Sequence, residues 1–116
     1  MELIVFDLDG TLLNRDSAIS AYTSETLNLL AERDVAYTVA TGRTLHASRA
    51  ILQGHGFDLP HIYKNGVMIW HPGSLHFSHH NMLTVSELRH VVQACLKQAL
   101  TPFVFTLEGD DGHAVY

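Results

Sequence analysis

The chain has 116 residues, of which 47% are hydrophobic and 16% are charged, a composition typical of one folded domain and not of a disordered chain. Its formal net charge of −5 comes without a clustered basic footprint, so we expect no nucleic-acid partner. No apolar run approaches the roughly 18 residues of a membrane span, and the N-terminus lacks the basic region of a signal peptide. The single cysteine, Cys95, cannot form an internal disulfide, which favours a reducing cytoplasmic location.

The N-terminal part of the chain alternates between strand-like and helix-like segments. Strands are expected over residues 3–6, 35–40 and 61–63. The first of them is apolar throughout, which predicts a strand covered on both faces. Helices are expected from about residue 20 to residue 33, with Tyr22, Leu27, Leu30 and Ala31 facing inward, and again after Thr44 as its N-cap. This order predicts an open α/β sheet with right-handed crossovers.

The pattern changes after Gly66. Residues 67–70 and 74–77 predict a hairpin, and residues 103–107 and 114–116 predict two later strands. Between them, Thr84 and Glu87 have the spacing of a capping box that opens a helix with one apolar stripe. We therefore expect two parts, an α/β part over residues 1–73 and a smaller α+β part over residues 74–116.

Three polar clusters directly follow the three predicted N-terminal strands. They comprise residues 7–11, 41–43 and 64–66. In an open α/β sheet, ligands bind at the carboxyl ends of the strands, so all three clusters are expected to meet in one crevice.

The first cluster contains two carboxylates, Asp7 and Asp9, at the end of a buried strand. A carboxylate in this position can attack phosphorus, and a second one can transfer the proton to the leaving oxygen and then activate water. Two carboxylates so close repel each other, and Mg²⁺ relieves that repulsion. Two simpler interpretations are the start of a Ca²⁺ loop, for which the remaining ligands are absent, and a solvated Asp-Gly turn. The matching clusters after the next two strands favour the phosphoryl-transfer centre.

Three segments carry a family resemblance. Asp7-Leu8-Asp9-Gly10-Thr11-Leu12-Leu13 resembles the first motif of the haloacid dehalogenase superfamily, Val39-Ala40-Thr41-Gly42-Arg43 is similar to the second motif of its Cof-type phosphatases, and Asn65-Gly66 resembles their phosphate-side turn. The resemblance implies a partial Rossmann-like core over residues 1–73, followed by the beginning of an inserted cap over residues 74–116. It implies that Asp7 is the nucleophile, that Asp9 is the general acid/base, and that the Asp7 carboxylate and the Asp9 carbonyl bind Mg²⁺. The substrate-binding residues that it implies are Thr11, Thr41, Gly42, Arg43, Asn65 and Gly66.

The expected substrate is a small phosphorylated metabolite such as a sugar phosphate. Members of the superfamily carry a lysine and an acidic Gly-Asp motif after the cap, and residues 109–112 are interpreted as a cap hairpin turn instead of that motif. We therefore expect an N-terminal fragment, or a chain that pairs with itself or a complementing chain through the open edge of residues 3–6. A catalytically inactive phosphatase-like protein and a phosphomutase are the alternatives. For Arg43, a contact to the substrate phosphate and a structural ion pair are rated evenly.

Overall fold

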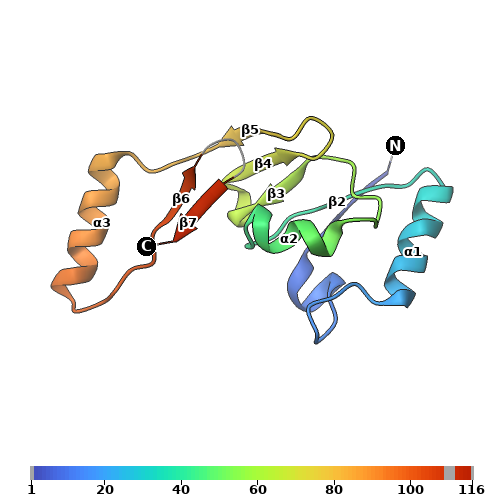
Figure 1. Cartoon of the computed structure of the whole chain (residues 1–116), viewed down its shortest axis with the longest axis horizontal. Coiled ribbons are helices and arrows are strands. Elements are labelled where there is room, and N and C mark those ends of the chain that lie inside the picture. The colour runs from blue at the N-terminus through green and yellow to red at the C-terminus, as the bar shows by residue number, and fades with distance from the viewer. Residues whose placement is uncertain (1, 109–111, 116) are drawn as a thin grey trace. The chain divides into compact units, whose positions relative to one another are not determined.

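A computed structural model describes residues 2–108 and 112–115 of the chain (Figure 1). Its α-helices and strands are β1 (Leu3–Phe6), α1 (Ala21–Glu32), β2 (Ala36–Val39), α2 (Leu45–Leu52), β3 (His61–Tyr63), β4 (Met68–His71), β5 (His76–His80), α3 (Val85–Lys97), β6 (Phe105–Glu108) and β7 (Gly112–Val115). The chain forms two compact units, Met1–His80 and Asn81–Tyr116. The expected division between residues 73 and 74, which concerns core and cap, stays a prediction. Of the turn expected at residues 109–112, residues 109–111 lie outside the described residues.

The first unit is built on a short parallel sheet. β1 pairs in parallel with β2, from Leu3 opposite Ala36 to Phe6 opposite Val39. A parallel bridge between Ala40 and Ile62 continues the sheet from the end of β2 to β3. β3, β4 and β5 then pair antiparallel, with a register irregularity in β4. The predicted α/β fold, a partial Rossmann-like core, is confirmed.

Two capped helices cover one side of this sheet. Ser20 accepts a hydrogen bond from the Thr23 amide at the start of α1, and Thr44 does the same for the Ala47 amide at the start of α2. The buried core beneath them consists of Leu8, Leu12, Leu13, Leu27, Tyr37, Val39, Leu52 and Phe57. The expected inward positions of Tyr22 and Ala31 are wrong, because both residues are exposed, Tyr22 to 80%. Tyr22 is five positions before the buried Leu27, which places the two about 140° apart around the helix.

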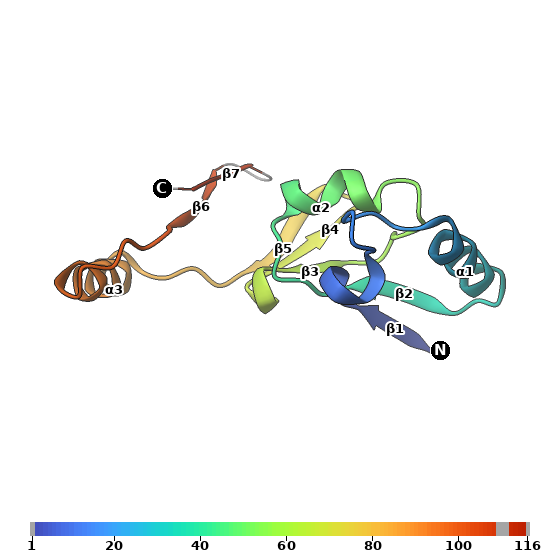
Figure 2. The ribbon, with the colours of Figure 1, turned by 90° about the horizontal axis from the view of Figure 1, so that it is seen from below.

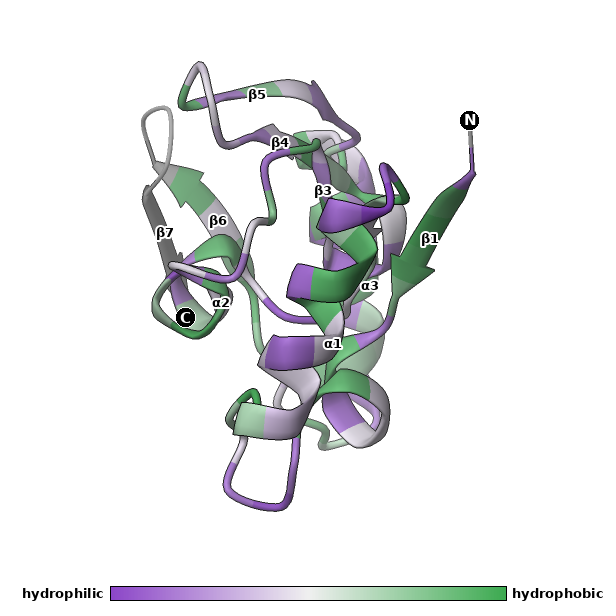
Figure 3. Cartoon of the chain, turned by 90° about the vertical axis from the view of Figure 1, so that its right-hand side faces the viewer, coloured by the Kyte–Doolittle hydropathy of each residue, from purple (hydrophilic) through white to green (hydrophobic). Residues whose placement is uncertain are grey.

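The prediction that β1 is covered on both faces is also wrong. Ile4 and Phe6 pack against the core, whereas Leu3 and Val5 are 56% and 48% exposed. Both α1 and α2 lie on the same side of the β1–β2 pair (Figure 2). β1 is accordingly an apolar strand at the edge of the sheet (Figure 3).

The second unit contains α3 and the β6–β7 hairpin. The predicted capping box is confirmed, since the Thr84 hydroxyl accepts from the Glu87 amide and the Glu87 carboxylate accepts from the Thr84 amide. The hydrogen bonds that the Glu87 carboxylate accepts from the Thr84 amide and from the Thr84 hydroxyl hold the pKa of Glu87 below its ordinary value. No described helix combines the length and the hydropathy that crossing a membrane requires.

Candidate active site

The turn after β1 presents Asp7 and Asp9 in different directions. Asp9 and Gly10 have φ/ψ values of −73°/124° and 75°/2°, the central residues of a type II turn. The positive φ explains the glycine, because that conformation is costly for a residue with a Cβ. The Asp7 carboxylate accepts a hydrogen bond of 2.8 Å from the Leu8 amide through Oδ1. Leu8 is fully buried in the core, and its packing there holds this turn in place.

The loop after β2 places Thr41 at the neighbouring strand end. Thr41 is only 4% exposed, and its amide donates to the Ile62 carbonyl at 2.9 Å. Its hydroxyl oxygen accepts a hydrogen bond of 3.1 Å from the Arg43 amide. Because a hydroxyl carries a donor as well as acceptor capacity, Thr41 keeps a hydrogen to donate to a ligand.

The turn after β3 is joined to that loop through backbone atoms. Lys64, Asn65 and Gly66 all have positive φ, at 50°, 56° and 93°. The Lys64 amide donates to the Arg43 carbonyl and the Asn65 amide donates to the Thr41 carbonyl, each at 3.1 Å. A Cβ on Gly42 would lie 3.1 Å from the Asn65 Oδ1 atom, so the glycine makes room for the Asn65 side chain.

These three strand ends line one open pocket in the first unit. It has a volume of about 450 Å³, within the range of small-molecule sites. It is lined by Asp7, Ala40, Thr41, Gly42, Ile62, Asn65 and Gly66. The structure therefore brings polar residues from three consecutive strand ends together at one pocket, as expected.

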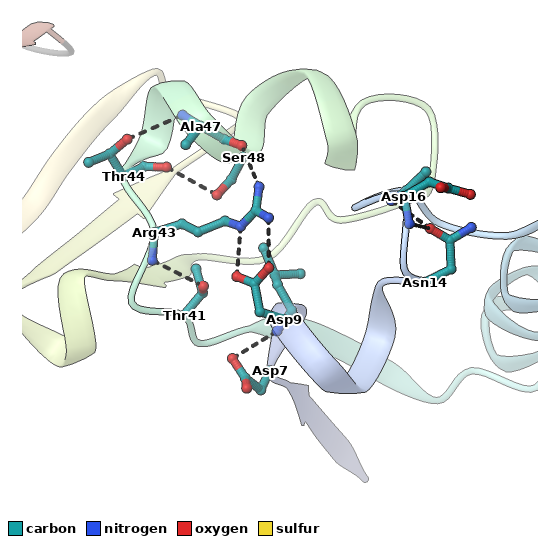
Figure 4. A network of polar contacts seen from close by, with 11 residues as sticks. Asp7, Asp9, Asn14, Asp16, Thr41, Arg43, Thr44, Ala47 and Ser48 are labelled. Atoms are coloured by element: carbon teal, nitrogen blue, oxygen red, sulfur yellow. Dashed lines mark hydrogen bonds and ion pairs between the residues drawn. The ribbon is translucent and has the colours of Figure 1, made fainter.

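Asp9 and Arg43 form a bidentate ion pair beside this pocket (Figure 4). Arg43 Nε donates to Asp9 Oδ2 at 2.7 Å, and Nη2 donates to Oδ1 at 2.6 Å. The third guanidinium nitrogen, Nη1, donates to the Ala47 carbonyl at 3.2 Å. The hydrogen bonds from Arg43 lower the pKa of Asp9, so its carboxylate is ionised at neutral pH in this arrangement.

A buried pair of polar side chains supports β3 from inside. His61 and Tyr63 are 5% and 0% exposed, and their Nδ1 and Oη atoms are 3.0 Å apart. His61 Nε2 lies 3.0 Å from the Phe57 carbonyl oxygen. A carbonyl only accepts, which assigns the ring proton to Nε2 and makes the Tyr63 hydroxyl the donor to Nδ1. Burial lowers the pKa of His61 and raises that of Tyr63, so both are neutral at pH 7.

The predicted site residues fall into two groups. Five of them line the pocket, namely Asp7, Thr41, Gly42, Asn65 and Gly66. Asp9 and Arg43 are not among the lining residues and contact each other instead, while Thr11 is exposed in the turn after β1. Sequence reasoning missed Ala40 and Ile62. The available signal was their position, because each is the last or next-to-last residue before a polar cluster at a strand end.

The donors available to a metal are few but of a suitable kind. In the described part of the chain, no group of three or more His, Cys, Asp or Glu side chains is arranged to hold an ion. Asp7 accepts a described hydrogen bond through only one carboxylate oxygen, whereas Arg43 occupies both oxygens of Asp9. Mg²⁺ is usually held by one or two carboxylates together with waters and substrate phosphates, so a single open carboxylate fits it.

The chain resembles solved structures of known family. Over 93% of its length it superposes on a haloacid dehalogenase-like hydrolase from Bacteroides thetaiotaomicron, with a TM-score of 0.73 and 26% identity, covering 41% of that protein. The chain also superposes, over 99% of its length, on a phosphatase of the haloalkanoate superfamily from the same organism, with a TM-score of 0.77, covering 41% of that protein. At 19% identity that likeness concerns the fold alone.

Sequence comparison gives the same family. The chain is 38% identical over 73 residues to the 5-amino-6-(5-phospho-D-ribitylamino)uracil phosphatase YwtE of Bacillus subtilis, which is 63% of this chain and 25% of that protein. It is 40% identical over 67 residues to the HMP-PP phosphatase of Shigella flexneri, which is 58% of this chain and 25% of that one. The match thus spans a quarter of these relatives. Residues 4–116 match the haloacid dehalogenase-like hydrolase family over almost the whole sequence. The chain belongs to that family.

Proposed function

We propose that this chain carries the nucleophile half of a Mg²⁺-dependent phosphomonoester hydrolase. The observation that supports this most is the pocket in which the Asp7 carboxylate, the Thr41 hydroxyl and the Asn65 amide meet from three strand ends. A carboxylate is the nucleophile, and neutral donors surround the place where a phosphoryl group would lie. Positioning and electrostatic stabilisation are what phosphoryl transfer requires of a protein.

Asp7 and Asp9 divide the chemistry between them. The Leu8 amide donates to Asp7 Oδ1 and so orients the carboxylate, one oxygen of which attacks phosphorus to form an acyl phosphate. Because its carboxylate is ionised in the arrangement without a ligand, Asp9 first takes up a proton from solvent. It then gives that proton to the departing alcohol oxygen and takes one back from the water that attacks the acyl phosphate. Water thereby receives the phosphoryl group, and Asp7 is regenerated.

Three further residues hold the phosphoryl group in this proposal. Thr41 donates its hydroxyl hydrogen to a phosphoryl oxygen, and Asn65 donates from its side-chain amide. Gly42 lets the ligand approach the backbone closely, since a side chain there would fill the space beside Asn65. Thr11 contributes by stabilising the turn that follows the nucleophile.

Magnesium completes the proposed site. The Asp7 carboxylate and the Asp9 backbone carbonyl would hold the ion, and the Asp9 side chain is left for proton transfer. Bound there, Mg²⁺ supplies charge neutralisation for the carboxylate and the phosphoryl oxygens.

The proposed substrate is a small phosphorylated metabolite such as a sugar phosphate. The pocket volume of about 450 Å³ suits a small molecule. YwtE and the Shigella protein are both named as phosphatases, and the name of YwtE specifies a phosphoribityl compound. Residues 74–116 are proposed to begin the cap that covers the substrate. A cytoplasmic location is proposed from the single cysteine alone.

The nucleophile assignment is tested with beryllofluoride, which mimics a phosphoryl group on a carboxylate. With Mg²⁺, ¹⁹F NMR of the chain is expected to show a bound beryllofluoride signal that disappears in Asp7→Asn. Asp16→Asn is the matched control, because Asp16 lies in the loop after the turn and away from the pocket lining. A signal that survives in Asp7→Asn would contradict the proposal. Hydrolysis of p-nitrophenyl phosphate, by the chain and by the longest reading frame that contains it, should follow the same pattern.

A pairing role is the second candidate, and β1 is the observation that favours it. Among the described residues β1 pairs only with β2, so its other edge has unpaired backbone groups beside the exposed Leu3 and Val5. We propose that a second copy or a complementing chain adds a strand there. Sedimentation velocity across a concentration series should show self-association that Leu3→Lys/Val5→Lys removes. A monomer at every concentration that binds no complementing chain would exclude this role.

A further inference from the structure

The ion pair between Asp9 and Arg43 has a geometry that bears on how Asp9 is used. Two guanidinium nitrogens contact the two carboxylate oxygens, at 2.7 Å and 2.6 Å. The hydrogen bond from Nη1 to the Ala47 carbonyl ties the same guanidinium to the first turn of α2. Both oxygens of Asp9 are therefore held in one direction, toward Arg43 and away from Asp7 (Figure 4).

This direction keeps Asp9 out of the pocket. The lining residues include Asp7 but not Asp9, and each Asp9 oxygen accepts a hydrogen bond from Arg43 instead. For Asp9 to exchange a proton with a leaving oxygen in the pocket, at least one of its oxygens has to leave the guanidinium. The pair is also accessible to solvent, with Arg43 and Asp9 side chains 22% and 58% exposed, so it can be exchanged without unfolding the core.

Arg43 is placed where a phosphoryl group can compete for it. Its amide donates to the Thr41 hydroxyl oxygen and its carbonyl accepts from the Lys64 amide, which anchors its backbone beside the lining residues Thr41 and Gly42. A phosphoryl group offers two oxygens to the guanidinium fork in the same way as a carboxylate does, and with more charge.

We propose that Arg43 is a positioning residue that exchanges partners. Without a ligand it holds the Asp9 carboxylate outside the pocket, and a phosphoryl group bound beside Thr41 takes the guanidinium and releases Asp9 to face the leaving oxygen. This inference rests on the proposed function of the pocket. It gives Arg43 the ion pair with Asp9 before a ligand binds and the contact with the phosphoryl group afterwards.

A double-mutant cycle on phosphate affinity tests the exchange. Inorganic phosphate is titrated, at constant ionic strength and without added metal, into the wild-type chain, Asp9→Asn, Arg43→Gln and the double variant. Asp9→Asn removes the competitor and is expected to tighten phosphate binding up to about fivefold more when Arg43 is present than when it is Gln. The loss of a negative charge next to the phosphate acts in both backgrounds and cancels. Arg49→Gln replaces Arg43→Gln in a control cycle, since Arg49 lies over the Trp70 ring and outside the pocket lining.

A second readout follows Arg43 itself. In ¹⁵N spectra, the Arg43 Nε–H resonance of the wild-type chain is expected to move with phosphate to the position that it has in phosphate-saturated Asp9→Asn. Equal tightening by Asp9→Asn in both backgrounds, or an Arg43 resonance that phosphate leaves unchanged, overturns the exchange. If the Thr41 and Gly42 amide resonances respond to phosphate in that case, the proposed phosphate site stands and only the exchange fails. If those amides do not respond either, both fail.

Discussion

Replacing Tyr63 with phenylalanine removes one hydroxyl from the buried support of β3. Tyr63 is 0% exposed, and its hydroxyl donates to His61 Nδ1 over 3.0 Å. The variant leaves that ring nitrogen without its donor in a place that is 5% exposed. A buried polar atom that loses its partner costs about 1–3 kcal/mol of the free energy of unfolding. That is a substantial part of the roughly 5–15 kcal/mol that stabilises an ordinary domain.

The measurement is equilibrium unfolding in urea, followed by circular dichroism. With an m-value of about 2 kcal/mol/M, a loss of about 2 kcal/mol moves the midpoint down by about 1 M. Tyr22→Phe is the matched control, because it also removes a tyrosine hydroxyl, but from a residue that is 80% exposed to solvent. Its effect is expected to stay within about 0.5 kcal/mol.

The refuting result is specific. If Tyr63→Phe is no less stable than Tyr22→Phe, the hydrogen bond between Tyr63 and His61 does not stabilise the fold. A lower m-value without a lower midpoint would point to a change in the compactness of one state instead of a lost bond.

Two other predictions concern pH and the pocket. Burial lowers the pKa of His61, so the unfolded chain binds a proton near pH 6.5 that the folded chain takes up only at lower pH. The free energy of unfolding therefore falls as the pH drops below about 6.5. This group contributes at most about 1.4 kcal/mol per pH unit to that fall. Urea unfolding at pH 7, 6 and 5 should show a shallower loss in His61→Gln, and equal losses would contradict the assignment. Thr41→Val removes the acceptor of the Arg43 amide and the hydroxyl that faces the pocket, and it should cost about 1 kcal/mol of stability and weaken phosphate binding, whereas Thr41→Ser keeps both. Calorimetric titration with inorganic phosphate separates the two variants, and equal affinities would remove Thr41 from the proposed site.

The order of elements could be predicted because short-range signals marked each boundary. Thr84 and Glu87 have capping-box spacing, and Thr44 precedes a helix whose buried positions, Leu45, Ser48 and Leu52, recur at helical intervals. The coverage of β1 could not be predicted in the same way. An apolar run indicates that the side chains of a strand favour burial, but it does not indicate which element will cover each face of the strand.

The composition of the pocket was predictable for a different reason. Parallel strands bring their carboxyl ends together, so Asp7, Thr41 and Asn65 followed from strand positions alone. The direction of the Asp9 side chain could not be predicted from strand positions. It depends on the rotamer of an arginine 34 residues further along the chain, and the sequence motif is equally compatible with a carboxylate that faces the pocket.

The backbone joints between the two loops affect how this site can evolve. The Thr41, Lys64 and Asn65 amides all donate to main-chain carbonyls, so these connections are made by backbone atoms. Most exchanges of the Lys64 side chain would leave these joints intact, and proline is the residue they exclude because it has no amide hydrogen. Side chains at the rim of the pocket can therefore be exchanged one at a time while the backbone frame between the strand ends stays the same.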